Sequence, residues 1–214
     1  MAKTVDAQHF KASIGMGIEN EATSYIVSPG GGQFTADGGQ TGIIKITLPV
    51  SWSNTMLRFN LEIYNYVTNS SVTYTIGGYN YSPSTSWYNT FAYASSNNDS
   101  SLGDLPVYFG HDGTKCAIYV GNADTSWSYP KFVISNVFTG HSNPAYSTWS
   151  SGWNLSIVSS RGTLTSGTEV LQPSIGRRNV KEIVYVNDLT KPLLRYSLNN
   201  GTVIDREMPV ASET

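Results

Sequence analysis

Short runs in which apolar and polar residues alternate constrain the fold of this chain more than any other feature. In the run 57–63 (LRFNLEI) every second residue is apolar, and the runs 44–48 and 72–76 repeat the pattern. A period of two is typical of a β-strand with one buried face. Turn residues recur about every 8–12 residues, which favours a sandwich over a fold that alternates strands with helices. The sequence therefore predicts an all-β, antiparallel sandwich or jelly-roll-like body.

Further strands are expected at 87–94, 107–109, 115–120, 132–138 and 155–158. The segment His111-Asp112-Gly113-Thr114 predicts a tight hairpin between two of them, because Asp-Gly supplies the positive φ angles that such a turn needs. Near the N-terminus, the apolar spacing from Val5 to Ile18 allows a short helix, although Gly15 and Gly17 weaken that interpretation.

Charge density divides the chain. Residues 41–160 hold nine charged residues, whereas residues 171–214 hold eleven in little more than a third of that length. We therefore expect an N-terminal attachment segment (1–40), a β-sandwich domain (41–165) and a charged β-hairpin tail module (166–214). The tail is predicted to contain a strand at 180–186 and a hairpin of 194–198 and 202–206, turned at Asn199-Asn200-Gly201. Two extra edge strands of one larger sheet are an equal alternative.

The composition excludes several classes of protein. Charged residues make up 13% of the chain and aromatic residues 12%, a balance opposite to that of disordered segments. The net charge of −2 gives no electrostatic footprint for nucleic acid. No apolar run is long enough for a membrane helix, so no membrane insertion is expected. The start MAKTVDAQHF lacks the apolar core of a signal peptide, and Cys116 has no second cysteine to pair with. These features predict folding in a reducing cytoplasm.

No catalytic, metal or cofactor site is expected. The chain has no Gly-x-Ser-x-Gly motif, and Cys116 lies in phase with Ile118 and Val120, where burial would make its thiol inert. The spacing of His9, His111 and His141 does not support a metal site. Loop carboxylates that a glycosidase would need are present, but the sequence cannot bring any two together; they are Asp99, Asp104, Asp112 and Asp124. We therefore expect no enzyme.

Aromatic residues beside Ser, Asn or Pro are the strongest binding signal. They occur in four groups where strands meet loops: Tyr79 and Tyr81, Trp87 and Tyr88, Trp127 and Tyr129, and Tyr146 and Trp149. Rigid rings next to small polar residues are typical of recognition loops, and sugars offer an apolar face and hydroxyl groups that suit them. Half or more of such rings in a β-protein are expected to be core instead. Tyr74 and Phe91 are better core candidates than binding candidates.

Residues 41–160 also resemble a domain of tail-fibre and other virion fibre proteins of tailed bacteriophages. The resemblance rests on GGYNY (77–81), FGHDGTKCAIYVG (109–121) and WSYPKFVISNV (127–137). It implies a receptor-binding or decorating β-domain, often in a homotrimeric fibre, and brings no catalytic residues with it. The short N-terminal segment and the charged tail depart from a long fibre and favour a compact spike, a fibre tip or a capsid-surface protein.

Two functions remain open on the sequence. One is a virion protein of tail-fibre or spike type that binds bacterial surface glycan through loop aromatics. The other is a capsid or tail decoration protein with a purely structural assembly role. In either case the expected partners are other virion proteins and further copies of the chain, most simply in a homotrimer. The expected location is the virion, assembled in the host cytoplasm.

Overall fold

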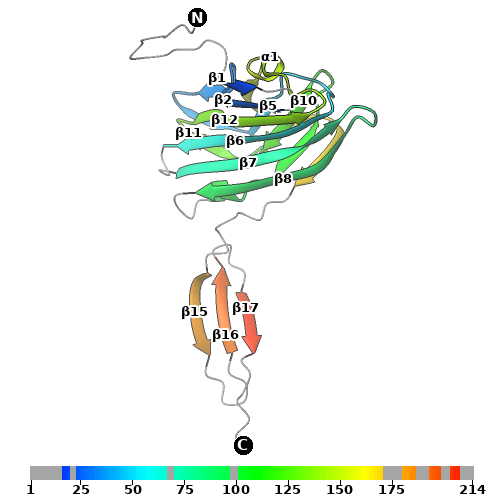
Figure 1. The fold of residues 1–214 in the computed structure, drawn as a ribbon. Coiled ribbons are helices and arrows are strands. Elements are labelled where there is room, and N and C mark those ends of the chain that lie inside the picture. Colours follow the sequence, from blue (N-terminus) through cyan, green and yellow to red (C-terminus); the bar gives the residue numbers. More distant parts are fainter. Residues whose placement is uncertain are drawn as a thin grey trace, which may run out of the picture.

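A computed structural model describes residues 16–19, 23–66, 70–96, 101–170, 180–186, 193–198 and 203–207. These residues form antiparallel sheets, and the predicted all-β fold is confirmed (Figure 1). The helical structure within these ranges is one α-helical turn, α1 (Tyr146–Trp149), and one 3-10 turn at Ser101–Gly103. No helix in the described part of the chain is long and apolar enough to cross a membrane.

The larger sheet has seven strands in the order β1-β2-β12-β6-β7-β8, with β3 also paired to β12. Their bounds are β1 (Met16–Glu19), β2 (Thr23–Ser28), β3 (Gln33–Thr35), β6 (Thr55–Asn65), β7 (Ser70–Tyr81), β8 (Ser86–Ser96) and β12 (Lys131–His141). Strands β2 and β3 follow one another along the edge of β12 that faces away from β6. Strands β1, β2 and β3 lie within the segment 1–40 that was expected to serve attachment, and they belong to this sheet. Of the segment 5–18, where the spacing allowed a short helix, residues 16–18 belong to strand β1, and residues 5–15 lie outside the described ranges.

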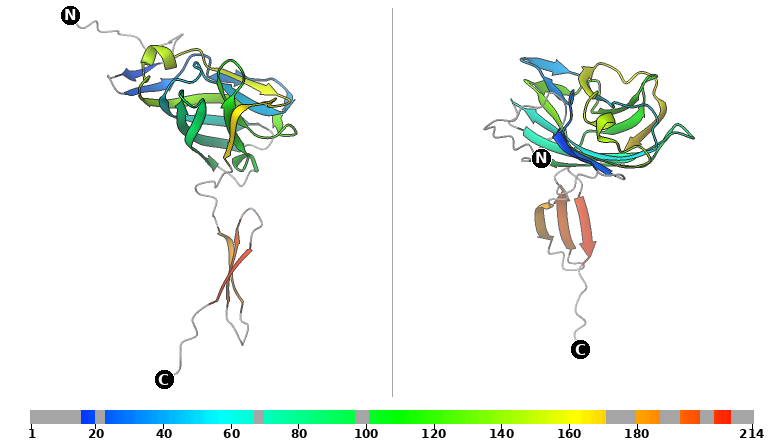
Figure 2. Two further views of the ribbon diagram at one scale, coloured as in Figure 1. Left: turned by 90° about the vertical axis from the view of Figure 1, so that its right-hand side faces the viewer. Right: turned by 45° about the horizontal axis from the view of Figure 1, so that its top comes forward.

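The second sheet has five strands in the order β13-β5-β10-β9-β14 and faces the first (Figure 2). Its strands are β5 (Ile43–Thr47), β9 (Val107–His111), β10 (Cys116–Val120), β13 (Asn154–Val158) and β14 (Thr165–Val170). Strand β14 pairs with β9, so this sheet extends beyond residue 165. A separate two-stranded ribbon joins β4 (Gly39–Thr41) to β11 (Ser126–Ser128).

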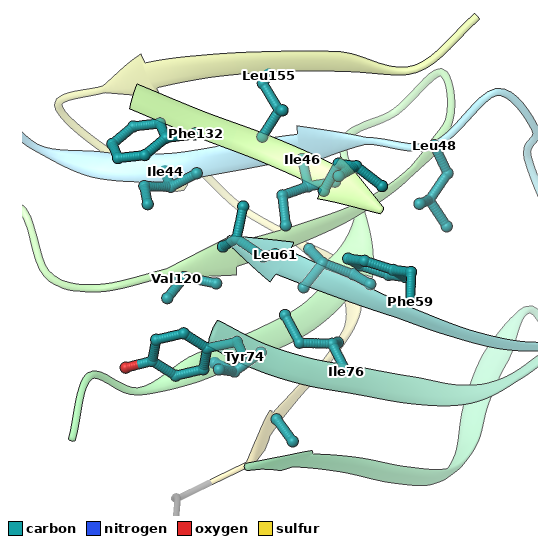
Figure 3. Packing of buried hydrophobic residues seen from close by; sticks show 14 of the residues in the cluster. Ile44, Ile46, Leu48, Phe59, Leu61, Tyr74, Ile76, Val120, Phe132 and Leu155 are labelled. Carbon is teal, nitrogen blue, oxygen red and sulfur yellow. The ribbon is translucent and has the colours of Figure 1, made fainter. Parts of the chain in front are cut away.

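The core lies between the two sheets, as Figure 3 shows. Strand β6 alternates strictly, with Leu57, Phe59, Leu61 and Ile63 buried and the residues between them turned outward. Ile44 and Ile46 of β5, and Leu48 just after it, belong to the same core cluster. Burying an aliphatic or aromatic side chain of this size contributes roughly 1.5–3 kcal/mol. The alternation in the sequence therefore predicts correctly which residues of these strands face the core.

Strand β10 departs from simple alternation because it is buried on both faces. Cys116, Ile118 and Val120 face the core between the sheets. Ala117 and Tyr119 face the opposite way, into a small cluster with Ile43 that Val158 and Leu164 help to cover. The chain between β13 and β14 thus shields the outer side of the central strand.

Burial determines the chemistry of Cys116. Its side chain is fully buried. Desolvation raises the pKa of its thiol to about 12, although a hydrogen bond from the Asn80 amide acts in the opposite direction. Since the thiolate is the reactive form, we expect negligible labelling by a thiol reagent at pH 7–8 in the folded protein and rapid labelling after denaturation. Fast labelling of the native protein would show that the β10 face opens to solvent.

The predicted hairpin between β9 and β10 is confirmed, but its loop comprises residues 112–115, because His111 ends β9 and pairs with Cys116. The Asp112 N–H donates to the Lys115 carbonyl oxygen (3.0 Å), and Gly113 has φ +99°. The Asp112 carboxylate accepts hydrogen bonds from the backbone N–H groups of Thr114 and Lys115, both at 2.9 Å, and from Lys45 Nζ at 2.6 Å. The carboxylate therefore links this hairpin to the neighbouring strand β5.

These contacts predict a pH-dependent stability. Partial burial raises the pKa of Asp112, but the hydrogen bond from Lys45 and the two backbone donors outweigh it and lower the pKa from 3.8 to about 2. A lowered pKa stabilises the fold above the unfolded value and loses that contribution as the pH falls. We therefore expect a loss of stability between about pH 4 and pH 2 that is smaller in Asp112→Asn. Acid unfolding curves for both proteins measure it; identical curves would contradict the assignment.

The charged tail forms a sheet of its own. Strands β15 (Val180–Val186), β16 (Leu193–Leu198) and β17 (Val203–Glu207) pair antiparallel in that order. The predicted strand and hairpin agree with these bounds to within one residue, while the turn at 199–201 lies outside the described residues. Among the residues described, these strands pair only with one another.

Candidate functional site

Three of the aromatic side chains predicted to bind a ligand are buried instead. Trp87, Trp127 and Trp149 are 6%, 1% and 0% exposed. Each indole N–H donates to a backbone carbonyl oxygen, of Gly110 (3.1 Å), Gly42 (2.8 Å) and Asn143 (2.8 Å) respectively. The expectation that Trp87 and Trp127 leave one face to solvent is therefore wrong. A tryptophan whose N–H finds an internal partner can be buried whole.

Three predicted tyrosines gather on the outer face of the large sheet. Tyr79 lies two residues from Tyr81 on β7 and directly opposite Tyr88 on β8. The ring centroids are 5.5 Å apart for Tyr79 and Tyr81, and 5.8 Å apart for Tyr81 and Tyr88. Tyr88 is 47% exposed. We call Tyr79, Tyr81 and Tyr88 the tyrosine platform.

A buried asparagine holds the platform in place. Asn80 lies between Tyr79 and Tyr81 and points inward, fully buried. Its side-chain oxygen accepts hydrogen bonds from the Thr55 N–H (2.9 Å) and the Ser53 hydroxyl (3.1 Å). Leaving a buried amide without hydrogen-bond partners costs free energy. A different register of β7, which would break these bonds, is therefore less stable. The register in turn orients both neighbouring tyrosines outward before any ligand arrives.

A groove of about 220 Å³ adjoins the platform and shares Tyr79 with it. Its lining residues are Met56, Leu57, Arg58, Gly78, Tyr79, Asn89, Phe91 and Phe138. Gly77 makes room for the Phe91 ring that lines this groove, since a Cβ atom at that position would lie 2.4 Å from Cζ of Phe91. The pairing of β7 with β8 is irregular between Gly77 and Tyr79, which is typical of a β-bulge. Phe91, expected in the core, lines this groove instead, whereas Tyr74 is fully buried as expected.

Tyr129 belongs to a different surface. Its ring contacts that of Tyr66 at a centroid distance of 5.8 Å, and a cavity of about 410 Å³ is lined by Tyr64, Tyr66, Tyr129 and Lys131. This patch lies at the far end of β6, eight residues beyond Met56, or about 27 Å at the usual strand rise. We call Tyr64, Tyr66 and Tyr129 the distal tyrosine patch. It is too far from the platform to share one sugar residue with it.

The last predicted tyrosine, Tyr146, begins helix α1 and is only partly exposed. It packs against the edge of the main core, and its backbone N–H donates to the Glu19 carboxylate (2.8 Å). It therefore stabilises the helical turn and lies outside the platform. The platform and its groove together form the candidate site.

The two described histidines occupy different environments. His111 is buried, bonds to the Ser51 hydroxyl (2.8 Å) and stacks on Trp52 at a centroid distance of 5.4 Å. His141 is exposed and contacts the platform, with its ring 5.6 Å from that of Tyr79. Within the described ranges no three His, Cys, Asp or Glu side chains form a group that could hold a metal ion; His9 lies outside those ranges.

Comparisons with protein-family models, with curated proteins and with solved structures found no match to this chain.

Proposed function

We propose that this chain is a virion protein of the bacteriophage tail-fibre or spike type, which binds bacterial surface glycan through the tyrosine platform. The observation that carries the proposal is the gathering of Tyr79, Tyr81 and Tyr88 on one exposed face beside a groove. Aromatic rings supply contact area at a low cost in side-chain entropy. We therefore assign sugar binding to these tyrosines and not to the buried tryptophans.

The chemistry of the platform suits a sugar. Each tyrosine offers a flat face for the C–H groups of a pyranose ring and a hydroxyl for hydrogen bonds to its oxygens. Ser84 adds a hydroxyl 3.2 Å from the Tyr88 hydroxyl. Asn89 is among the residues that line the adjoining groove. The site therefore holds both rings and hydroxyl groups, as recognition of a polyhydroxylated ligand requires.

The proposal is tested by co-sedimentation of the purified chain with intact bacterial cells and with the same cells after chemical removal of their surface polysaccharide. Binding that is lost with the polysaccharide supports it. Binding that persists on stripped cells, or a chain that adheres to no cells in a broad panel of strains, would overturn it.

The distal tyrosine patch favours a second candidate, a capsid or tail decoration protein with an assembly role. Tyr66 is 61% exposed and Tyr64 42%, and exposed aromatic clusters often mark contacts between proteins. In this account the patch is covered by a neighbouring virion protein or by another copy of the chain.

We propose further that the chain forms a homo-oligomer, most simply a homotrimer. Light scattering of the purified protein at micromolar concentration is expected to give three times the mass of one chain. Substituting Tyr66→Ser in the distal tyrosine patch should weaken the assembly, whereas Tyr88→Ser in the platform should not. A wild-type chain that remains monomeric would contradict this prediction without bearing on glycan binding.

A further inference from the structure

We infer that the glycan bound by this protein is acidic and that Arg58 binds a carboxylate on one of its sugar residues. This inference rests on the proposed glycan-binding function and names the class of ligand. Arg58 projects from β6 on the outer face of the large sheet and is the one charged residue among those that line the groove beside the tyrosine platform.

The register of the sheet explains how the Arg58 side chain is placed. Phe138 on β12 and Gly77 on β7 are its partners across the two neighbouring strands, and Phe91 on β8 follows Gly77 in the same row. The guanidinium carbon lies 5.9 Å from the centroid of the Phe138 ring. This cation–π contact holds the guanidinium over an aromatic surface, and on its other side the Phe91 ring packs over Gly77, where there is no side chain in the way.

No carboxylate of the described residues neutralises Arg58. The ion pairs within the described ranges are Lys45–Asp112 and Lys131–Asp37. The nearest acid along the same strand face, Glu62, is four residues away, or about 13 Å, and accepts a hydrogen bond from the Ser135 hydroxyl. A cation without an internal partner beside an apolar groove is available to an anionic group of a ligand.

The side chains that line the groove restrict the chemical class of ligand that it can bind. A guanidinium presents a planar pair of N–H donors that matches the two oxygens of a carboxylate. The other lining residues, including Tyr79, Asn89 and Phe91, are uncharged and can contact the ring and hydroxyls of the sugar that bears it. The volume of about 220 Å³ lies below the roughly 300–1,000 Å³ of pockets for larger ligands. The groove therefore accommodates one sugar residue, with the polymer continuing across the platform.

The overall charge of the protein does not account for such a preference. The chain carries a formal net charge of −2, which disfavours an acidic polymer at long range. Selectivity for acidic glycan must therefore come from the local contact with Arg58, and it should be lost when this one side chain is changed.

The test uses a panel of uronic-acid capsular polysaccharides and the same polymers after reduction of their carboxyl groups to neutral alcohols. Equilibrium binding of the wild-type chain is expected to weaken about tenfold or more on reduction. In Arg58→Gln the acidic and reduced polymers should bind equally, and Arg58→Lys should restore part of the preference because it keeps the charge but not the planar fork. Because Arg58 is exposed, both variants should keep the wild-type melting temperature, which serves as the folding control.

The outcomes separate this inference from the proposed function. Equal binding of acidic and reduced polymers by the wild type would overturn the role of Arg58 and leave glycan binding intact. Binding of a phosphate-bearing teichoic acid but of no uronic-acid polymer would likewise overturn the carboxylate assignment. Failure of the wild type to bind any polysaccharide in the panel would overturn both.

Discussion

Substituting Trp127→Ala is expected to lower the free energy of unfolding by about 3–5 kcal/mol, the usual cost of removing a buried aromatic side chain. The Trp127 side chain is 1% exposed. Its indole N–H donates to the Gly42 carbonyl oxygen at 2.8 Å, and its ring meets that of Phe132 at a centroid distance of 5.2 Å. The substitution would leave both a cavity and an unsatisfied carbonyl beside β5. Chemical denaturation of the purified protein measures the effect.

Two further variants control this result. Trp127→Phe keeps most of the ring but loses the hydrogen bond to Gly42, so we expect an intermediate loss of stability. Tyr88→Ala removes an exposed ring that makes no contact with the core cluster, and surface substitutions of this kind usually change stability by less than about 0.5 kcal/mol. If Trp127→Ala unfolded at the same denaturant concentration as Tyr88→Ala, the burial of Trp127 would be contradicted.

The strand pattern of the sequence predicts the inner faces of the sheets because burial there follows a period of two. In β6, Phe59 and Leu61 alternate with outward residues over the whole strand, and the structure confirms each position. Isolated aromatic residues at the ends of strands carry no such signal. Trp87 and Tyr88 are neighbours on the same strand, yet one is buried and the other exposed, and only the register of β8 decides between them.

Irregular pairing explains why the groove could not be predicted. In β12 the register shifts between Ser135 and Phe138, and Asn136 has φ +53°. This bulge keeps Val137 buried and turns Phe138 outward beside Arg58. An asparagine in the middle of an apolar strand was the available signal, because Asn adopts a positive φ more readily than most residues.

The glycine pair at Gly77 and Gly78 shows a related effect. Glycines usually interrupt a strand, so the sequence places the end of a strand before them. In the structure β7 continues to Tyr81, because the close approach of Phe91 at Gly77 requires a residue without a side chain. The tyrosine platform depends on this continuation, since Tyr79 and Tyr81 follow the glycines on the same strand.

The central claim is that the tyrosine platform binds glycan, and a pair of matched double variants tests it most directly. One is Tyr81→Ser/Tyr88→Ser in the platform, and the other is Tyr64→Ser/Tyr66→Ser in the distal tyrosine patch on the same face of the large sheet. Both pairs remove two outward-facing rings, so both variants should keep the folded structure of the wild type by circular dichroism.

The measurement is the dissociation constant of each protein for a single-repeat oligosaccharide of a surface polysaccharide that the wild type binds, because a monovalent ligand gives the same constant whether or not the chain is oligomeric. Because removal of a central aromatic at a recognition surface costs about 2 kcal/mol or more, we predict at least a thirtyfold loss of affinity for the platform variant. The distal variant should bind as the wild type does. Unchanged binding by the platform variant, or an equal loss in both variants, would contradict the account.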